Sequence, residues 1–304
     1  MRLDIEFSAA RGTILRGWLY VPEGVGRRPG VVMAHGFSAT KEMALDRFAE
    51  VFCAAGLVVL VYDHRNLGSS DGLPRQQINP WAQARDYRHA IGWLAARPEV
   101  DPGRIAIWGS SFSGAHVLAV GAIDPRIRAV VANVPFAALP GMDYSDAADL
   151  RRRFEALRAA LLDESGAGPA DSKALPVGPL QVVAEAPGEP CFLPQPESSA
   201  WFLAAGRRPG STWRNRFTLV GSVAGQPTWD PGVCAPFVSP RALLMVVASE
   251  DRLAATDLAL ASFERAGEPK RLEVIAGDHF ASYEGEAFAQ ASKAMRDFLL
   301  EQLA

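Results

Sequence analysis

The sequence predicts an α/β fold in which a mostly parallel central sheet has helices on both faces and an inserted cap. First, strand-like runs such as residues 57–62 are apolar without alternation, which is typical of parallel strands buried on both faces. Second, these runs alternate with segments whose apolar residues have helical spacing. Third, the alternation stops near Pro135 and resumes at residue 241, which predicts an insertion between two strands of one sheet.

The first half supplies most of the sheet. Residues 1–7 alternate polar and apolar side chains and include early acidic residues, which predicts an edge strand and not a signal peptide. Further strands are expected at residues 13–21, 30–34, 57–62, 104–108 and 129–134. Helices are expected at residues 41–55, at 81–97 and in a segment ending at Gly121. Gly56 is suited to end the first helix, and Pro98 stops the second.

The second half contains the insertion and then completes the sheet. Strands are expected at 241–248 and 270–275, and helices at 255–266 and 286–303. We therefore assign residues 1–135 and 236–304 to the core and 136–235 to a cap or lid. Within the cap, residues 147–162 have helical character, whereas 166–196 are rich in proline and glycine and predict a loop, and 198–205 form a short run to which no element is assigned. Residues 206–240 show no pattern that predicts an element.

Bulk properties exclude several function classes. A net charge of -3 without a sustained basic cluster argues against a nucleic-acid partner. No run of 18 apolar residues exists, so no membrane span is expected. Cys53, Cys191 and Cys234 are widely spaced and odd in number, which indicates neither a metal site nor a disulfide framework. We expect a cytoplasmic protein without metal or cofactor, and a homodimer is an open possibility.

The stretch Gly109-Ser110-Ser111-Phe112-Ser113 predicts the chemistry. It follows the apolar run at residues 105–107 and precedes a helix-like run. A strand that turns through Gly-x-Ser-x-small into a helix is the nucleophile elbow of a serine hydrolase, and it exposes the central serine above the sheet. The last small residue is usually glycine, whereas here it is Ser113, followed by Gly114. Ser111 is the candidate nucleophile.

A serine nucleophile needs a base, and the base needs an orienting acid. In this architecture the chain order is Ser, then Asp or Glu, then His. Asp251 follows the expected strand at 241–248, and His279 follows the strand at 270–275, so both are expected at the carboxyl edge of the sheet. Glu250 and Asp257 compete with Asp251 for the role of the acid. We expect Asp278, beside His279, to have a surface role.

The remaining histidines have different expected roles. His35-Gly36-Phe37 directly follows the strand at 30–34, a position that supplies the second oxyanion-hole N–H in this architecture. We therefore assign the backbone amides of Phe37 and Phe112 to the oxyanion hole. His64, which follows the strand at 57–62, and His116, which lies in the helix after the elbow, are expected to have structural roles, and His89 is expected at the surface or in the core.

These motifs make the chain resemble the α/β-hydrolase superfamily. The resemblance also includes the stretch Tyr62-Asp63-His64-Arg65-Asn66-Leu67-Gly68-Ser69-Ser70-Asp71-Gly72 and covers residues 1–135 and 236–304. Within the superfamily, the chain is similar to the dienelactone-hydrolase and X-prolyl-peptidase-like branch, which includes bacterial serine esterases and fungal polyketide-pathway hydrolases. Ser111 departs from the elbow cysteine of dienelactone hydrolase and from the elbow aspartate of haloalkane dehalogenases and epoxide hydrolases. The resemblance implies Ser111 as nucleophile, His279 as base and Asp251 as its orienter.

We therefore expect a hydrolase that cleaves a carboxylic ester, thioester or lactone of a small-molecule acyl substrate through an acyl-enzyme on Ser111. Trp201, Trp213 and Trp229 are candidates for an apolar substrate pocket, and equally for a small core of the cap. Acyl transfer or C–C bond cleavage with the same three residues is an alternative. A ligand-binding protein on a hydrolase fold is an alternative of another class.

Overall fold

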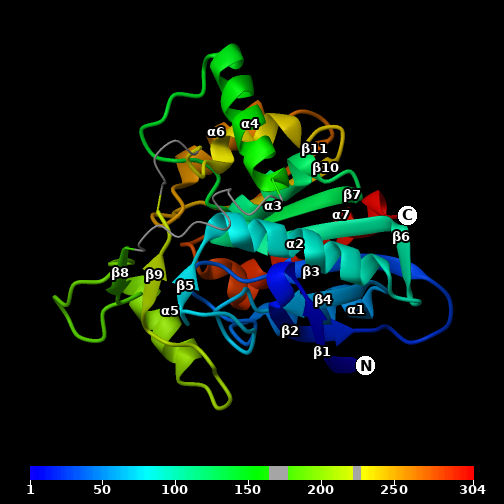
Figure 1. Cartoon of the computed structure of the whole chain (residues 1–304), viewed down its shortest axis with the longest axis horizontal. Helices are drawn as coiled ribbons and strands as arrows, with labels where there is room; N and C mark the ends of the chain where they lie inside the picture. The colour runs from blue at the N-terminus through cyan, green and yellow to red at the C-terminus, as the bar shows by residue number, and fades with distance from the viewer. Residues whose placement is uncertain (164–176, 222–226) are drawn as a thin grey trace.

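The computed structural model describes residues 1–163, 177–221 and 227–304. Its centre is an eight-stranded sheet with the strand order β1-β2-β4-β3-β6-β7-β10-β11 (Figure 1). The strands are β1 (Arg2–Ser8), β2 (Ile14–Tyr20), β3 (Arg28–Ala34), β4 (Val58–Tyr62), β6 (Val100–Ser110), β7 (Ile127–Asn133), β10 (Ala242–Ala248) and β11 (Lys270–Ile275). β2 runs antiparallel to both of its neighbours, β1 and β4, and all other neighbours are parallel. The predicted, mostly parallel sheet is confirmed.

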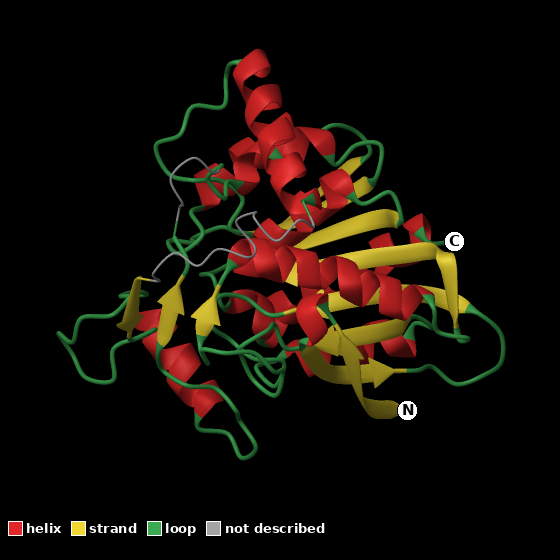
Figure 2. Ribbon diagram, in the orientation of Figure 1, coloured by secondary structure: helices red, strands yellow, loops and turns green. Residues whose placement is uncertain are grey.

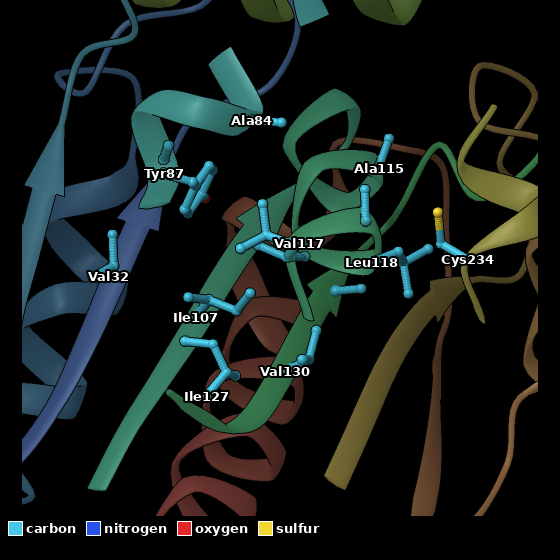
Figure 3. Packing of buried hydrophobic residues seen from close by; sticks show 14 of the residues in the cluster. Val32, Ala84, Tyr87, Ile107, Ala115, Val117, Leu118, Ile127, Val130 and Cys234 are labelled. Atoms are coloured by element: carbon cyan, nitrogen blue, oxygen red, sulfur yellow. The ribbon is translucent and has the colours of Figure 1, made fainter. Parts of the chain in front are cut away.

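Helices cover both faces of the sheet (Figure 2). They are α1 (Leu45–Ala54), α2 (Pro80–Ala95), α3 (Phe112–Ile123), α6 (Thr256–Arg265) and α7 (Gly285–Gln302). α2, α3 and α6 pack on one face, where they meet strand residues such as Val32 and Ile107. Figure 3 shows these two side chains close to α2 and α3. α1 and α7 pack on the other face against the alternate residues, such as Val31 and Trp108. Both faces of each central strand are therefore buried, which explains why the strands read as unbroken apolar runs.

The cap contains more regular structure than the sequence predicts. Its elements are α4 (Ala147–Leu162), β8 (Val177–Leu180), α5 (Pro196–Gly206), β9 (Phe217–Leu219) and the short helix η3 (Pro231–Val233). The expected helix at 147–162 is confirmed with the same bounds, and the short run at 198–205, to which the sequence assigns no element, lies in α5. β9 pairs with β8 and with β5 (Gln77–Ile78), which belongs to the first part of the chain. Of the predicted loop, residues 166–176 lie outside the described residues, and the division at 136 and 235 stays a prediction.

One helix begins later than its apolar spacing predicts. α1 starts at Leu45 and not at residue 41, because the four preceding residues form a turn. The backbone N–H and the ammonium group of Lys41 both donate to Asp63, each at 2.7 Å. Ala44 then takes a left-handed conformation with φ of 72° just before the helix. Hydrogen bonds to a distant residue therefore outweigh local helical propensity here.

None of the helices in the described part of the chain combines the length and the apolar character that a membrane span needs.

Candidate active site

Ser111 stands on a sharp turn between β6 and α3, as the motif predicts. Its backbone has φ of 56° and ψ of −117°, a conformation that is costly for a residue with a side chain and that is typical of functional sites. A Cβ added at Gly109 would lie 2.1 Å from the carbonyl oxygen of Ser113, and one at Gly114 would lie 2.5 Å from Pro135 Cβ. The tight turn therefore requires glycine at 109 and 114 and leaves room for a serine at 113.

The three residues selected from the sequence meet at the carboxyl edge of the sheet. His279 lies in the loop after β11, and Asp251 lies in the loop after β10. His279 Nε2 is 2.8 Å from Ser111 Oγ, and His279 Nδ1 is 2.6 Å from Asp251 Oδ2. Because a carboxylate only accepts, Nδ1 carries the proton, and Nε2 accepts the hydroxyl hydrogen of Ser111. The hydrogen bonds therefore run in the direction that activates the hydroxyl.

The surroundings of Asp251 keep this carboxylate ionised and oriented. Its Oδ1 accepts the backbone N–H groups of Leu253 and Ala254, both at 2.8 Å. Burial alone would raise the pKa of Asp251, but the hydrogen bonds from His279 and the two amides lower it below its ordinary value. The other acidic residues near Asp251 and His279 do not contact the imidazole of His279. Glu250 and Asp257 are exposed, and Asp278 accepts the N–H of Phe280 at 2.9 Å.

The loop after β3 brings backbone amides close to the nucleophile. A Cβ added at Gly36 would lie 2.9 Å from Ser111 Cβ and 3.4 Å from Ser111 Oγ, so this loop packs directly against the elbow. Phe37 follows Gly36, and Phe112 is the first residue of α3, whose N–H has no acceptor within the helix. The positive end of the helix dipole favours a negative charge at the same place. Phe37 and Phe112 both line the cavity that contains Ser111 Oγ.

Sequence reasoning missed a polar network on the other side of the elbow. The hydroxyl groups of Ser110 and Tyr283 are 2.5 Å apart. Asn133 Nδ2 donates to Ser110 Oγ at 3.0 Å and to Ser282 Oγ at 3.1 Å, and Ser111 N–H donates to Asn133 O at 2.9 Å. The network therefore joins the elbow to β7 and to the loop after His279. The repeated serines of the elbow were its one signal, since the partners lie far away in sequence.

The stretch from Tyr62 to Gly72 forms the loop beneath the site. Asp63 is fully buried and accepts from the side chains of Lys41 and Ser69 at 2.7 and 3.0 Å. Gly68 has φ of 51°, and a Cβ added there would lie 2.2 Å from Asp63 Oδ2, so glycine is required. The ring of His64, also fully buried in the loop, contacts the ring of His35. The structural roles expected for His64 and for His116, which packs beside it, agree with these positions.

Ser111 and His279 open into a cavity of about 500 Å³ between the core and the cap. Its wall is largely aromatic and aliphatic, and it includes Phe37, Phe112, Phe136, Phe192, Trp201, Phe202, Trp229 and Phe280. Its volume and apolar character are typical of sites for small organic ligands. Within the described residues, no group of three or more histidine, cysteine, aspartate or glutamate side chains is placed to hold a metal ion.

The three tryptophans named from the sequence separate into two groups. Trp201 and Trp229 line the cavity, as expected. Trp213 does not line it, so the pocket role is wrong for this residue and the second alternative, a core of the cap, agrees with its position. Its ring packs against Phe202 with 5.6 Å between centroids, and a Cβ added at Gly206 would lie 2.2 Å from its Cε3 atom. Trp213 therefore belongs to the core of the cap, because the close approach to α5 holds its ring away from the cavity.

The chain is similar to known proteins over most of its length. Residues 12–164 match the family model described as X-Pro dipeptidyl-peptidase (S15 family). The thiohydrolase aneE of Aspergillus aculeatus is 30% identical over 311 residues, which cover 99% of this chain and 93% of that protein. The polyketide transferase grgF of Penicillium sp is 30% identical over 276 residues, which cover 91% of this chain and 88% of that protein. The matches to these two relatives extend through the cap, which the sequence motifs do not cover.

A solved structure resembles the same extent of the chain. The α/β hydrolase GrgF from Penicillium sp. sh18 superposes with a TM-score of 0.74 at 29% identity. The match covers 100% of this chain and 99% of that chain. The likeness therefore includes both the sheet with its helices and the cap.

Proposed function

Because the chain belongs to the α/β-hydrolase superfamily, we propose that it cleaves a carboxylic ester, thioester or lactone through an acyl-enzyme on Ser111. It is an enzyme of the serine hydrolase or acyltransferase class. One observation carries the assignment of the chemistry to particular residues. The hydroxyl of Ser111, the imidazole of His279 and the carboxylate of Asp251 form one chain of hydrogen bonds at the wall of an apolar cavity.

The geometry supports the following sequence of steps. His279 Nε2 takes the hydroxyl proton as Ser111 Oγ attacks the carbonyl carbon of the substrate. The N–H groups of Phe37 and Phe112 donate to the oxygen of the tetrahedral intermediate, which carries the negative charge. His279 then gives its proton to the leaving alkoxide or thiolate as the carbon–oxygen or carbon–sulfur bond breaks. A water molecule repeats the attack on the acyl-enzyme and releases the acid.

The apolar wall of the cavity indicates that the protein binds its substrate through an apolar acyl group. The rings of Phe37 and Phe112 stand edge to face, 5.5 Å apart, and both line the cavity. The residues proposed for the oxyanion hole thus also form part of the acyl-binding wall. Burying each methylene of an acyl chain against such a wall stabilises the complex by about 0.8 kcal/mol. We infer that a small-molecule acyl compound is the partner of this site.

The proposal is tested with a panel of p-nitrophenyl esters, acyl thioesters and lactones, together with a fluorophosphonate probe that labels activated serines. Wild-type protein is expected to turn over at least one class and to take up the probe on Ser111. Ser111→Ala is expected to lose at least about 1,000-fold in kcat and all labelling. Ser110→Ala is the matched control, because it removes the neighbouring hydroxyl and leaves Ser111 to be labelled.

Absence of both turnover and labelling in folded wild-type protein would overturn the proposal. That result would favour the non-catalytic alternative, a ligand-binding protein on a hydrolase fold. Turnover that persists in Ser111→Ala would place the chemistry on another residue.

Acyl transfer with the same residues is a second candidate, favoured by the likeness to a polyketide transferase along nearly the whole chain. The two candidates share the acyl-enzyme and differ in what attacks it, water or an alcohol or amine. Product analysis separates them. If transfer dominates, an added primary alcohol or amine becomes acylated and the yield of free acid falls. If hydrolysis dominates, the acid remains the main product at every acceptor concentration.

We infer a reducing location, the cytoplasm, from the state of the cysteines. Cys53, Cys191 and Cys234 are all free thiols. Burial raises the pKa of the Cys234 thiol well above its ordinary value, which keeps it protonated and unreactive. Cell fractionation tests this inference, and recovery of the protein in an oxidising compartment would contradict it.

A further inference from the structure

Ser113 occupies the elbow position where the motif usually has glycine, and the mechanism described above does not use it. It lies in the first turn of α3 and is completely buried. Its Oγ donates to the backbone carbonyl oxygen of His35 at 2.5 Å. This carbonyl can only accept, so the hydroxyl hydrogen of Ser113 points at the loop after β3.

Two imidazoles hold the hydroxyl in that orientation. His64 Nε2 lies 2.8 Å and His116 Nδ1 lies 3.2 Å from Ser113 Oγ. The hydroxyl has a single hydrogen, which His35 O receives, so both ring nitrogens must donate and together fill the two lone pairs. This assigns the proton to Nε2 in His64 and to Nδ1 in His116. The opposite ring nitrogens, His64 Nδ1 and His116 Nε2, are buried and have no hydrogen-bond partner among the described residues, as unprotonated nitrogens can.

The hydrogen bonds of His35 determine its tautomer in the same way. His35 Nδ1 lies 2.9 Å from Gly36 O and donates to it, while His35 Nε2 accepts the backbone N–H of His64 at 3.2 Å. Burial lowers the pKa of all three imidazoles, so they stay neutral and keep these tautomers. Ser113, the three histidines and Tyr87, whose buried hydroxyl also interacts with Ser113, therefore form one buried network.

This network joins the two halves of the proposed oxyanion hole. One donor, the N–H of Phe37, lies on the loop after β3, two residues beyond His35. The other donor, the N–H of Phe112, lies on α3 and is adjacent to Ser113. The hydrogen bond from Ser113 to His35 O thus directly links α3 to the loop after β3, the two elements that carry the donors.

We propose that Ser113 is a positioning residue that fixes the separation of the Phe37 and Phe112 amides in the oxyanion hole. The inference rests on the proposed function. Catalysis by such donors depends on their preorganisation, and a displacement of about 1 Å can cost about 100-fold in rate. Substrate binding depends mainly on the apolar wall, which Ser113 does not line. Loss of the hydrogen bond from Ser113 to His35 O should therefore lower kcat and leave KM nearly unchanged.

The test compares Ser113→Ala and Ser113→Cys with wild-type enzyme on an ester and on its thiono analogue, in which sulfur replaces the carbonyl oxygen. An oxyanion hole stabilises a negative oxygen better than the larger and weaker acceptor sulfur. Both variants are expected to lose about 10- to 100-fold in kcat on the ester and much less on the thiono ester, so that the ratio of the two rates falls. Ser113→Cys replaces the hydroxyl with a somewhat larger thiol, a weak hydrogen-bond donor that leaves no empty space, and keeps the test available if Ser113→Ala does not fold.

Ser262→Ala is the matched control, because Ser262 is equally buried and also donates to a backbone carbonyl, that of Ala137 at 3.4 Å. It is expected to keep the wild-type ratio. A ratio unchanged in Ser113→Ala or Ser113→Cys, or a loss shared equally by both substrates, would overturn the inference. If wild-type enzyme has no turnover that depends on Ser111, the proposed function itself fails.

A second readout does not depend on activity. Nitrogen-15 NMR of the five histidines is expected to show a protonated Nε2 in His64 and a protonated Nδ1 in His116, with slowly exchanging protons. The opposite tautomer at either ring would overturn the network on which the inference stands.

Discussion

At the scale of single residues, the reactivity of Ser111 depends on where His279 carries its proton. Asp251 determines this position, because its carboxylate has no hydrogen to offer and so must receive the proton of Nδ1. Its other oxygen is already occupied by two backbone amides. The carboxylate therefore cannot turn away from His279 without losing hydrogen bonds. Asp251 therefore both orients the imidazole of His279 and places a negative charge beside it.

Asp251→Asn is expected to lower kcat by about 1,000- to 10,000-fold while the fold remains intact. The amide oxygen replaces Oδ1 in accepting from Leu253 and Ala254, which places the NH₂ group opposite His279 Nδ1. Nδ1 must then accept, so Nε2 carries the proton and can no longer take the hydrogen of Ser111. The measurement is kcat on the best ester of the panel. Asp278→Asn, on the residue next to His279, is the control, and an equal loss in both variants would contradict the role of Asp251.

The sequence predicts this triad because each member follows a strand whose pattern is clear. Ser110 and Ser113 show the limit of such reasoning. Their polar partners, Tyr283 and His35, are separated from them by 173 and 78 residues, and only the closed sheet brings them together. The pattern indicates small residues at the elbow, but it contains nothing about which of their hydroxyls bond to distant loops. Side-chain networks of this kind depend on tertiary packing and cannot be predicted from local spacing.

At the scale of elements, α5 divides the space between cap and core. A second cavity, of about 510 Å³, lies beside the active-site cavity. The two cavities share Met43, Trp201, Phe280 and Tyr283 as walls. Trp201 projects from α5, and its ring stacks on that of Phe280 with 5.0 Å between centroids. Trp201 is therefore one of the four side chains that separate an acyl group in the active-site cavity from the second cavity.

Trp201→Ala is expected to shift the preferred acyl chain toward longer substrates. Removing the indole connects the two cavities, and each further methylene that finds apolar contact gains about 0.8 kcal/mol, roughly fourfold in kcat/KM. The measurement is kcat/KM along a series of p-nitrophenyl esters. Trp213→Phe is the control, because Trp213 belongs to the same cap and lines neither cavity. An unchanged optimum in Trp201→Ala would show that the acyl group lies elsewhere.

The elements themselves differ in how well the sequence predicts them. The central strands and the cap helix Ala147–Leu162 follow from periodicity, because burial on both faces or on one face leaves a clear pattern. The strands β5, β8 and β9 have two to four residues each, too few for any period to show. β9 pairs with β5 across about half the chain, so this pairing depends on how the cap docks on the core.

At the scale of the whole molecule, the fold keeps three imidazoles uncharged. His35, His64 and His116 are completely buried, and burial lowers the pKa of each, that of His116 to about 3. In the unfolded chain these groups have their ordinary pKa of about 6.5. Below that pH the unfolded state therefore binds more protons than the folded state, so stability is complete above about pH 6.5 and is lost as the pH falls. The depressed pKa of Asp251 acts in the same direction only near pH 4 and below.

The free energy of unfolding is therefore expected to fall between pH 6 and pH 4.5, by up to about 1.4 kcal/mol per pH unit for each buried histidine. His116→Asn keeps a donor at the position of Nδ1, facing Ser113, and removes the titrating ring. Urea unfolding measured across this range should show a slope smaller by about 1.4 kcal/mol per pH unit in the variant than in wild type. Above pH 7.5 the two proteins should have parallel curves, which serves as the internal control. Equal slopes below pH 6 would mean that His116 takes up its proton in the folded state, and the network around Ser113 would then have to accommodate a charge.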